Sequence, residues 1–216
     1  MLGRLRKPWP DGPKRRVDEH FSQAVLAGDA LRPLMVSRPA IAQELILAAY
    51  IEEPQHQNEY ESSMRLNDGG FAFQSKNTPA MYFFGPWLLF LRTNPAYGLA
   101  TIIRITDFAT DRWLERFQGF NRTKEEPGYR LYFADGQKDY IGNANVYNWH
   151  RYMNNDAVGV ESALMALEKW LYEQIDQKKD ISAEINWILQ ESKSAAFLGL
   201  LVAVGLYNLT LFTHEQ

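Results

Sequence analysis

One short segment of the sequence gathers the side chains best suited to molecular recognition. Between Tyr140 and Asp156 the chain reads YIGNANVYNWHRYMNND, and its second half interleaves aromatic and basic residues. Aromatic rings and guanidinium groups stack on bases and grip peptides, so the segment is a candidate interaction site. Its candidate residues are Tyr147, Trp149, His150, Arg151 and Tyr152. The alternative is structural: the three rings anchor a long loop on neighbouring helices, and Arg151 pairs with a helix carboxylate.

Residues that could support catalysis are scattered along the chain. The four histidines, at positions 20, 56, 150 and 214, form no metal-ligand pair of helical spacing, and there is no cysteine. Gly-rich phosphate loops and the G-x-S-x-G elbow are also missing from the sequence. We therefore expect no metal, no cofactor and no catalytic residue. A small enzyme remains the alternative, with its site near His150, Arg151 and Glu161.

Three carboxylates, Glu161, Glu168 and Glu173, lie on the strongest helical segment of the chain. Their spacing of seven and five residues spreads them around a helix instead of bringing them together as a catalytic set. We expect them on a solvated face. The opposite face carries an apolar stripe made of Val160, Leu164, Leu167, Leu171 and Ile175.

Helical periodicity dominates the rest of the sequence. Helices are predicted over residues 16–27, 39–53 and 94–117, and from near Val158 onward. A further helix begins at Asp180 or Ser182, and the last one at Ser192 or Ser194. The exception is Asp135-Gly136, a dipeptide typical of tight hairpin turns, between two runs of strand-forming residues. The predicted fold is mainly α, with helix pairs in a solenoid-like or irregular bundle and one inserted β-hairpin near 129–142. Residues 16–216 form a single helical domain, with a flexible loop at 53–80 where periodicity is lost.

Charge separates the N-terminus from the rest of the chain. Residues 1–16 hold six Lys or Arg and one Asp, whereas the whole protein has a net charge of −3. We expect residues 1–15 to form a basic flexible arm; the alternative is an arm that touches nucleic acid or lipid. The overall charge does not favour nucleic acid as a partner. The lack of cysteine and of a secretory signal fits a cytoplasmic protein.

The run AAFLGLLVAVGLYNLTLF, at 195–212, is about the minimum length for a membrane-spanning helix. No Lys or Arg follows it to set an orientation, and Gly199, Gly205 and Asn208 weaken it as a membrane segment. We expect a buried core helix that turns at Asn208, the alternative being a tail anchor. We also expect one side of the helix to stay uncovered, so that the chain self-associates through residues 197–212.

Several strings resemble a known class of proteins. They are SRP at 37–39 with AAYIEEP at 48–54, FGPWLLFLRTNP at 84–95, ESALMALEKWLY at 161–172 and SKSAAFLGLLVAVG at 192–205. Together they resemble an internal stretch, over residues 35–212, of very large and poorly characterised bacterial ATP-binding proteins. Those proteins join an NTPase module to a long helical region, an arrangement similar to the signal-transducing ATPases used in defence.

The resemblance implies a fragment without the ATPase, because this chain carries no nucleotide-binding motif. The function we expect is a non-catalytic helical interaction or scaffold module. Its partner would be another protein or the adjoining helical repeats of a larger chain.

Overall fold

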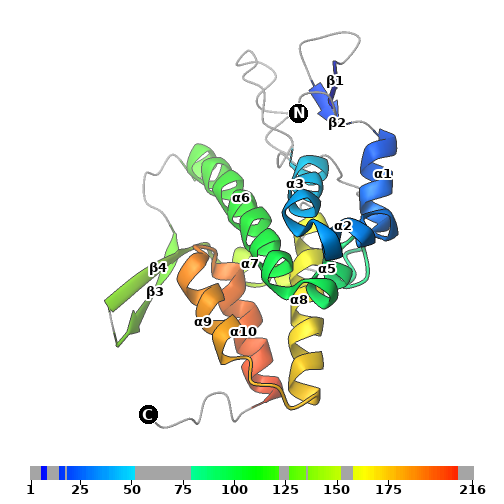
Figure 1. Cartoon of the computed structure of the whole chain (residues 1–216). Helices are drawn as coiled ribbons and strands as arrows, with labels where there is room; N and C mark the ends of the chain where they lie inside the picture. Colours follow the sequence, from blue (N-terminus) through cyan, green and yellow to red (C-terminus); the bar gives the residue numbers. More distant parts are fainter. Residues whose placement is uncertain are drawn as a thin grey trace.

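The computed structural model describes residues 6–8, 15–17, 19–51, 79–121, 127–134, 136–151 and 158–208. Its elements are β1 (Arg6–Pro8), β2 (Arg15–Val17), α1 (Glu19–Ala27), the short 3-10 helix η2 (Asp29–Leu31), α2 (Arg32–Ser37), α3 (Pro39–Tyr50), α5 (Trp87–Thr93), α6 (Pro95–Asn121), β3 (Gly128–Phe133), β4 (Gly136–Ile141), α7 (Ala144–Tyr147), the 3-10 helix η3 (Trp149–Arg151), α8 (Val158–Asp176), α9 (Ser182–Glu191) and α10 (Ala195–Tyr207). This part of the chain is mainly helical with an inserted hairpin, which confirms the predicted fold class (Figure 1).

The predicted hairpin is formed by β3 and β4. The two strands are antiparallel, which confirms the hairpin. Phe133 lies opposite Gly136, so Gly136 begins β4 instead of standing in the turn, and the reversal comes earlier than the dipeptide Asp135-Gly136 predicts. A second short ladder, between β1 and β2, was not predicted; β1 lies inside the expected arm at 1–15. The rest of that arm except for Arg15, and the expected flexible loop at 53–80 except for Pro79 and Ala80, lie outside the described residues.

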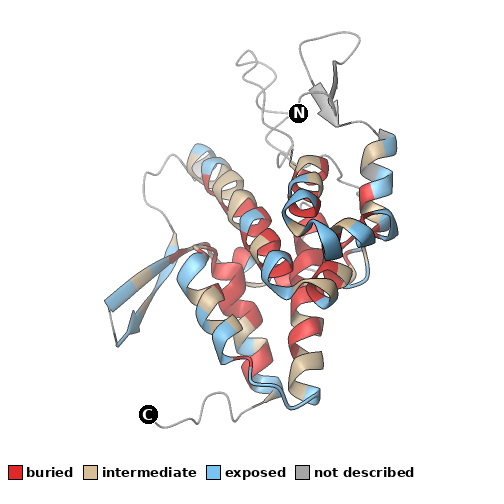
Figure 2. Ribbon diagram, in the orientation of Figure 1, coloured by how far each residue is buried: buried red, intermediate tan, exposed pale blue. Residues whose placement is uncertain are grey.

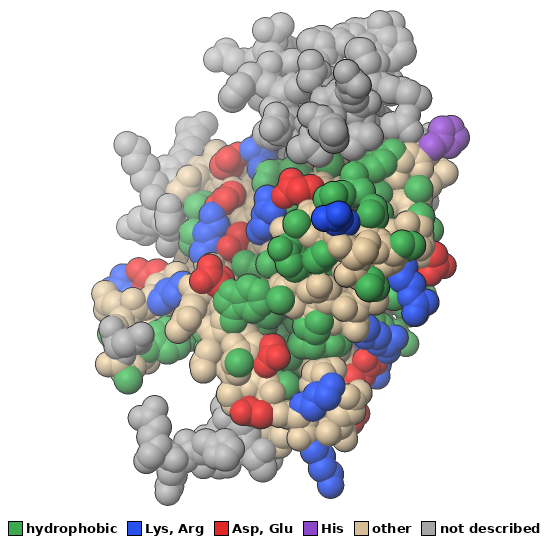
Figure 3. Space-filling model, in the orientation of Figure 1, with side chains coloured by type: hydrophobic (Ala, Val, Ile, Leu, Met, Phe, Trp, Pro, Cys, Tyr) green, Lys and Arg blue, Asp and Glu red, His purple; other side chains and the backbone are tan. Residues whose placement is uncertain are grey.

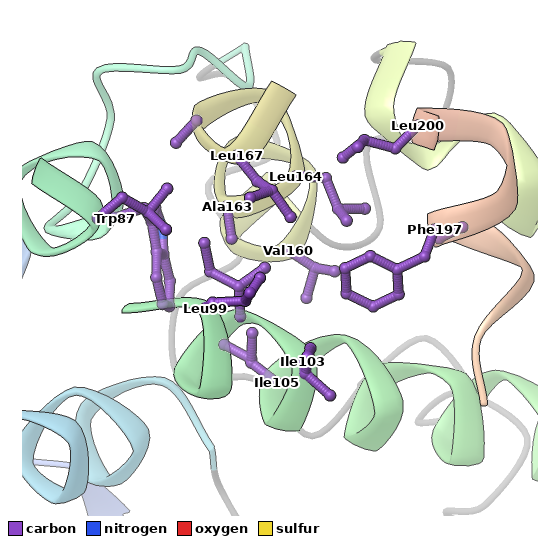
Figure 4. Packing of buried hydrophobic residues seen from close by; sticks show 14 of the residues in the cluster. Trp87, Leu99, Ile103, Ile105, Val160, Ala163, Leu164, Leu167, Phe197 and Leu200 are labelled. Atoms are coloured by element: carbon purple, nitrogen blue, oxygen red, sulfur yellow. The ribbon is translucent and has the colours of Figure 1, made fainter. Parts of the chain in front are cut away.

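The helices pack around α8 as an irregular bundle. α8 contacts α5, α6, α10 and η3, and α10 also contacts α7 and η3. The predicted apolar stripe of α8 is confirmed: its first four residues are fully buried and Ile175 is partly buried. Figure 4 shows Leu164 and Leu167 of α8 near Trp87 of α5, Leu99 of α6 and Leu200 of α10. Burial is densest along α8 and α10 (Figure 2).

The solvated carboxylate face expected on α8 is wrong at Glu161. This side chain is fully buried, because every residue from Val158 to Leu164 is enclosed and no side of the first turn faces solvent. An acidic residue there is still favoured by the positive end of the helix dipole. Glu173 is half-buried and binds Arg92 of α5 through two hydrogen bonds, so it too belongs to the packing.

The apolar helix α10 begins where the sequence predicts. The Ser194 hydroxyl accepts a hydrogen bond from the Ala196 amide, and Phe197 is fully buried in the core. Within the described ranges, no helix is both long and apolar enough to cross a membrane. One strip of α10 is exposed, as expected, with Val202 and Leu206 facing outward. Self-association through residues 197–212 stays a prediction.

Candidate functional site

The predicted recognition segment folds into α7 and η3. Trp149 is only 6% exposed and His150 only 2%, while Tyr147 is half-buried. Arg151 is exposed, and Tyr152 lies outside the described residues. Trp149 and His150 are therefore not available to a partner, because η3 packs both side chains inward against α8 and α10. For Trp149 this agrees with the alternative, in which the ring anchors the segment on neighbouring helices.

His150 is held in place by hydrogen bonds on both sides of its ring. Its Nε2 accepts from the Arg151 Nε, which leaves the proton on Nδ1, 3.2 Å from the Tyr147 carbonyl oxygen. Burial, and then the charge of Arg151, lower the pKa of His150 to about 4. The imidazole is therefore neutral near pH 7, and both its nitrogens are engaged. This geometry is that of a structural histidine rather than of a general base.

Protonation of His150 should make the fold sensitive to acid. The unfolded chain binds this proton near pH 6.5 and the folded chain only near pH 4. Stability is therefore complete above pH 6.5 and is lost as the pH falls toward 4, by roughly 2 kcal/mol from this group. Denaturant titrations between pH 7 and pH 4 should show a flatter profile for His150→Asn than for the wild type. A His20→Asn control, at an exposed position of α1, should follow the wild type. Parallel curves for all three proteins would contradict the assignment.

Close approach of α10 fixes the position of this segment. A Cβ atom at Gly199 would lie 2.0 Å from the Tyr147 carbonyl oxygen and 2.9 Å from the His150 Cε1. Only a glycine allows the backbone of α7 and the ring of His150 to contact α10 so closely. The positions of Tyr147 and His150 thus depend on a glycine that lies about fifty positions later in the chain.

Arg151 joins a polar and aromatic cluster between η3, α8 and α10. The Tyr172 hydroxyl donates to Glu168, and the Tyr172 ring lies 4.3 Å from that of Tyr207. The Tyr207 hydroxyl donates to Asp176 at 2.8 Å. Burial raises the pKa of Glu168, partly offset by the Tyr172 hydrogen bond and the charge of Arg151. Glu168 is therefore not the freely solvated carboxylate that we expected.

Where side chains are described, no three His, Asp or Glu residues gather as metal ligands would.

Sequence analysis missed the exposed aromatic residues of β3. Tyr132 is 78% exposed, and Tyr129 and Phe133 are also exposed. On the same strand Arg130 makes two hydrogen bonds to Asp139, at 2.6 and 2.8 Å. Figure 3 shows the hairpin at the left of the molecule as a projection that carries apolar and charged groups together. The predicted hairpin itself was the available signal. A two-stranded hairpin can pack only one of its faces against the helices, so part of its side chains must stay exposed.

The hairpin is anchored firmly at its base. The Lys138 ammonium and the Tyr140 hydroxyl both donate to the Leu189 carbonyl of α9 at 2.7 Å. The Ile141 amide donates to the Lys193 carbonyl, also at 2.7 Å. Tyr140 is fully buried. β4 is therefore fixed against α9 and the α9–α10 connection, while β3 carries the exposed aromatic residues.

The α9–α10 connection is in turn fixed to α6. Asp107 accepts hydrogen bonds from the Ser192 hydroxyl at 2.9 Å and the Lys193 amide at 3.2 Å. The Thr110 hydroxyl donates to that of Ser194 at 2.7 Å. Ser192 and Ser194 are fully buried, whereas Asp107 is partly buried, so this network holds the backbone of the connection in position at the edge of the core. The hairpin is therefore hydrogen-bonded to α9 and to the α9–α10 connection, and this connection is hydrogen-bonded to α6.

Comparison with known proteins leaves the family open. No protein-family model matches the chain, and no curated protein sequence matches it either. The resemblance to the helical region of large bacterial ATP-binding proteins therefore stays a prediction.

Proposed function

We propose that this protein is a non-catalytic protein-interaction module and that the β3–β4 hairpin is its recognition element. The observation that carries the proposal is the exposure of three aromatic side chains on one six-residue strand: Tyr129, Tyr132 and Phe133. Tyrosine is enriched at protein interfaces, because it offers a large apolar ring together with a polar tip.

The rigid base of the hairpin supports this role. Ordering a flexible loop on binding costs free energy, and a pre-ordered element avoids much of that cost. Here β4 is already hydrogen-bonded to the helical part of the protein in the absence of a partner, through Lys138, Tyr140 and Ile141. The exposed side chains of β3 therefore keep a fixed arrangement, as binding aromatic residues of other rigid interfaces do.

The charges of the hairpin favour a protein partner over a nucleic acid. Binding to phosphates needs cationic groups that are available to neutralise them. Arg130 is already paired with Asp139, and Lys138 donates to backbone carbonyls of α9. Both described cationic side chains of the hairpin are thus engaged, and the protein as a whole is slightly acidic.

The second part of the proposal concerns the setting of the module. A neighbouring helical unit, in a larger protein of the class that the sequence resembles, would cover the exposed strip of α10 at Val202, Leu206 and Tyr207. Exposed apolar strips of this kind are typical of interfaces between helical units.

Co-purification from the cells that make the protein tests the role of the hairpin. Tyr132→Ala combined with Phe133→Ala should remove the bound partner and leave the melting temperature unchanged, because both rings are exposed. The matched control is Tyr82→Ala with Phe83→Ala, a second exposed aromatic pair outside the hairpin, whose rings lie 5.2 Å apart. This control should keep the partner. Equal retention, or equal loss, in the two double variants would contradict the proposal.

A further inference from the structure

Among the described residues, no strand lies beside the outer edge of β3. Within the described chain β3 pairs with β4 alone, whereas β4 is also bonded to the α9–α10 connection through Ile141. In an antiparallel pair the N–H and C=O groups of alternate residues point away from the partner strand. Natural edge strands are usually protected by proline, lysine or a bulge. β3 reads GYRLYF and pairs with β4 residue by residue, so it has no proline, lysine or bulge. Its one charged residue, Arg130, is paired with Asp139 of β4.

The register of the hairpin defines its two faces. Tyr129, Leu131 and Phe133 share a face with Tyr140 and Lys138, the face that contacts α9. Arg130 and Tyr132 lie on the opposite face, across from Asp139 and Gln137. Alternate residues of β3 therefore belong to different environments, and any added strand has to respect that alternation.

Symmetry restricts how two β3 strands can pair. If two copies pair antiparallel about a two-fold axis perpendicular to the sheet, one residue must lie opposite its own copy. Centred on Arg130, the pairing would oppose two like charges, which is unfavourable. Centred on Tyr132, it would leave Tyr129 without a partner in the opposite strand.

The register centred on Leu131 pairs every residue from Tyr129 to Phe133 with a residue of the opposite strand. Leu131 lies opposite the partner subunit's Leu131. Arg130, which stays bonded to Asp139, lies opposite the partner subunit's Tyr132, so no like charges face each other. Tyr129 lies opposite the partner subunit's Phe133, an aromatic cross-strand pair. The Tyr129 ring is already 6.0 Å from that of Tyr147, so the incoming ring would extend an existing aromatic group.

We propose that two copies of this chain pair through β3, in the register that places Leu131 opposite itself, to form a four-stranded antiparallel sheet. This inference rests on the proposed role of the hairpin as the interaction element, and it names a second copy of the chain as the partner. The contact is small, so the dimer should be weak and should depend on concentration.

Cysteine cross-linking tests the register directly, because the chain has no cysteine of its own. Directly opposed residues have Cβ atoms about 4.5–5.5 Å apart, close enough for a disulfide after small shifts, whereas diagonal neighbours lie about 7–8 Å apart. Leu131→Cys should therefore form covalent dimers under mild oxidation. Tyr132→Cys should stay monomeric, although position 132 is the more exposed of the two. No dimer with Leu131→Cys, or equal cross-linking at the two positions, would overturn the proposal.

A charged variant tests the same contact without oxidation. Leu131→Glu keeps a partner inside its own hairpin, since Lys138 lies directly opposite, but it opposes two carboxylates at the two-fold axis. Sedimentation velocity over rising concentration should show dimer for the wild type and only monomer for this variant. Because Leu131 also packs against the helical core, circular dichroism should first show that the variant is folded at the temperature used. A wild type that stays monomeric would refute the dimer. In that case loss of a different partner in the Tyr132→Ala, Phe133→Ala variant would still support the proposed function, whereas retention of every partner would refute that function too.

Discussion

Leu167→Asp is expected to unfold the helical body, at a cost of about 4 kcal/mol or more. Leu167 has no exposed surface, and it lies in the middle of α8, the helix that α5, α6, α10 and η3 surround. A carboxylate there would lose its hydration and find no cation. Circular dichroism should show loss of the cooperative thermal transition.

The matched control for this change is Leu206→Asp. The same substitution is made there in α10, but Leu206 is 62% exposed. Its effect on the free energy of unfolding should stay below about 0.5 kcal/mol. Similar melting temperatures for the two variants would show that the packing of α8 is wrong.

Gly199→Ala should also be strongly destabilising, by about 3 kcal/mol. The added methyl group would lie 2.0 Å from the Tyr147 carbonyl oxygen, which is backbone and cannot rotate away. α10 would have to move off α7 and η3, which would also disturb the hydrogen bond from His150 to Tyr147. Chemical denaturation should therefore show a lower midpoint, and near-ultraviolet spectra should report a changed environment for Trp149.

Gly119→Ala provides the opposite control. Gly119 lies in α6, and a Cβ atom there would meet nothing within 4 Å. Alanine loses less backbone entropy than glycine when a helix forms, so this variant should gain up to about 1 kcal/mol. If both variants shifted stability in the same direction, the close approach of α10 to α7 would be disproved.

The parts of the fold that sequence analysis predicted are those set by local patterns. The stripe from Val160 to Leu171 follows from helical spacing. The presence of a hairpin follows from the turn dipeptide between two strand-forming runs, although Gly136 itself belongs to β4. The start of α10 follows from the capping preference of Ser194. Each of these signals lies within a few residues of the structure that it predicts.

The parts that sequence analysis missed depend on contacts between distant segments. Trp149 and His150 are buried because Gly199 lets α10 approach them, and no local pattern connects these positions. Glu161 is buried because its whole helical turn is enclosed, whereas periodicity alone predicts one buried face. An aromatic residue in a loop can anchor that loop on the protein or bind a partner. For Trp149 the packing of η3 against the helices decides in favour of anchoring. Strand-forming residues predict the hairpin, but they do not indicate which of its side chains the helices cover. The exposure of Tyr129, Tyr132 and Phe133 therefore does not follow from the local pattern.

Photo-cross-linking from position 132 tests the central claim, that the hairpin is the recognition element, most directly. A photoreactive phenylalanine analogue would replace Tyr132 in one variant and Phe83, also exposed but outside the hairpin, in the other. On irradiation in the cells that make the protein, we expect one discrete protein adduct from position 132, identified by mass spectrometry as a second copy or another protein. Position 83 should give none. The absence of an adduct at position 132, or the same adduct from both positions, would contradict the claim.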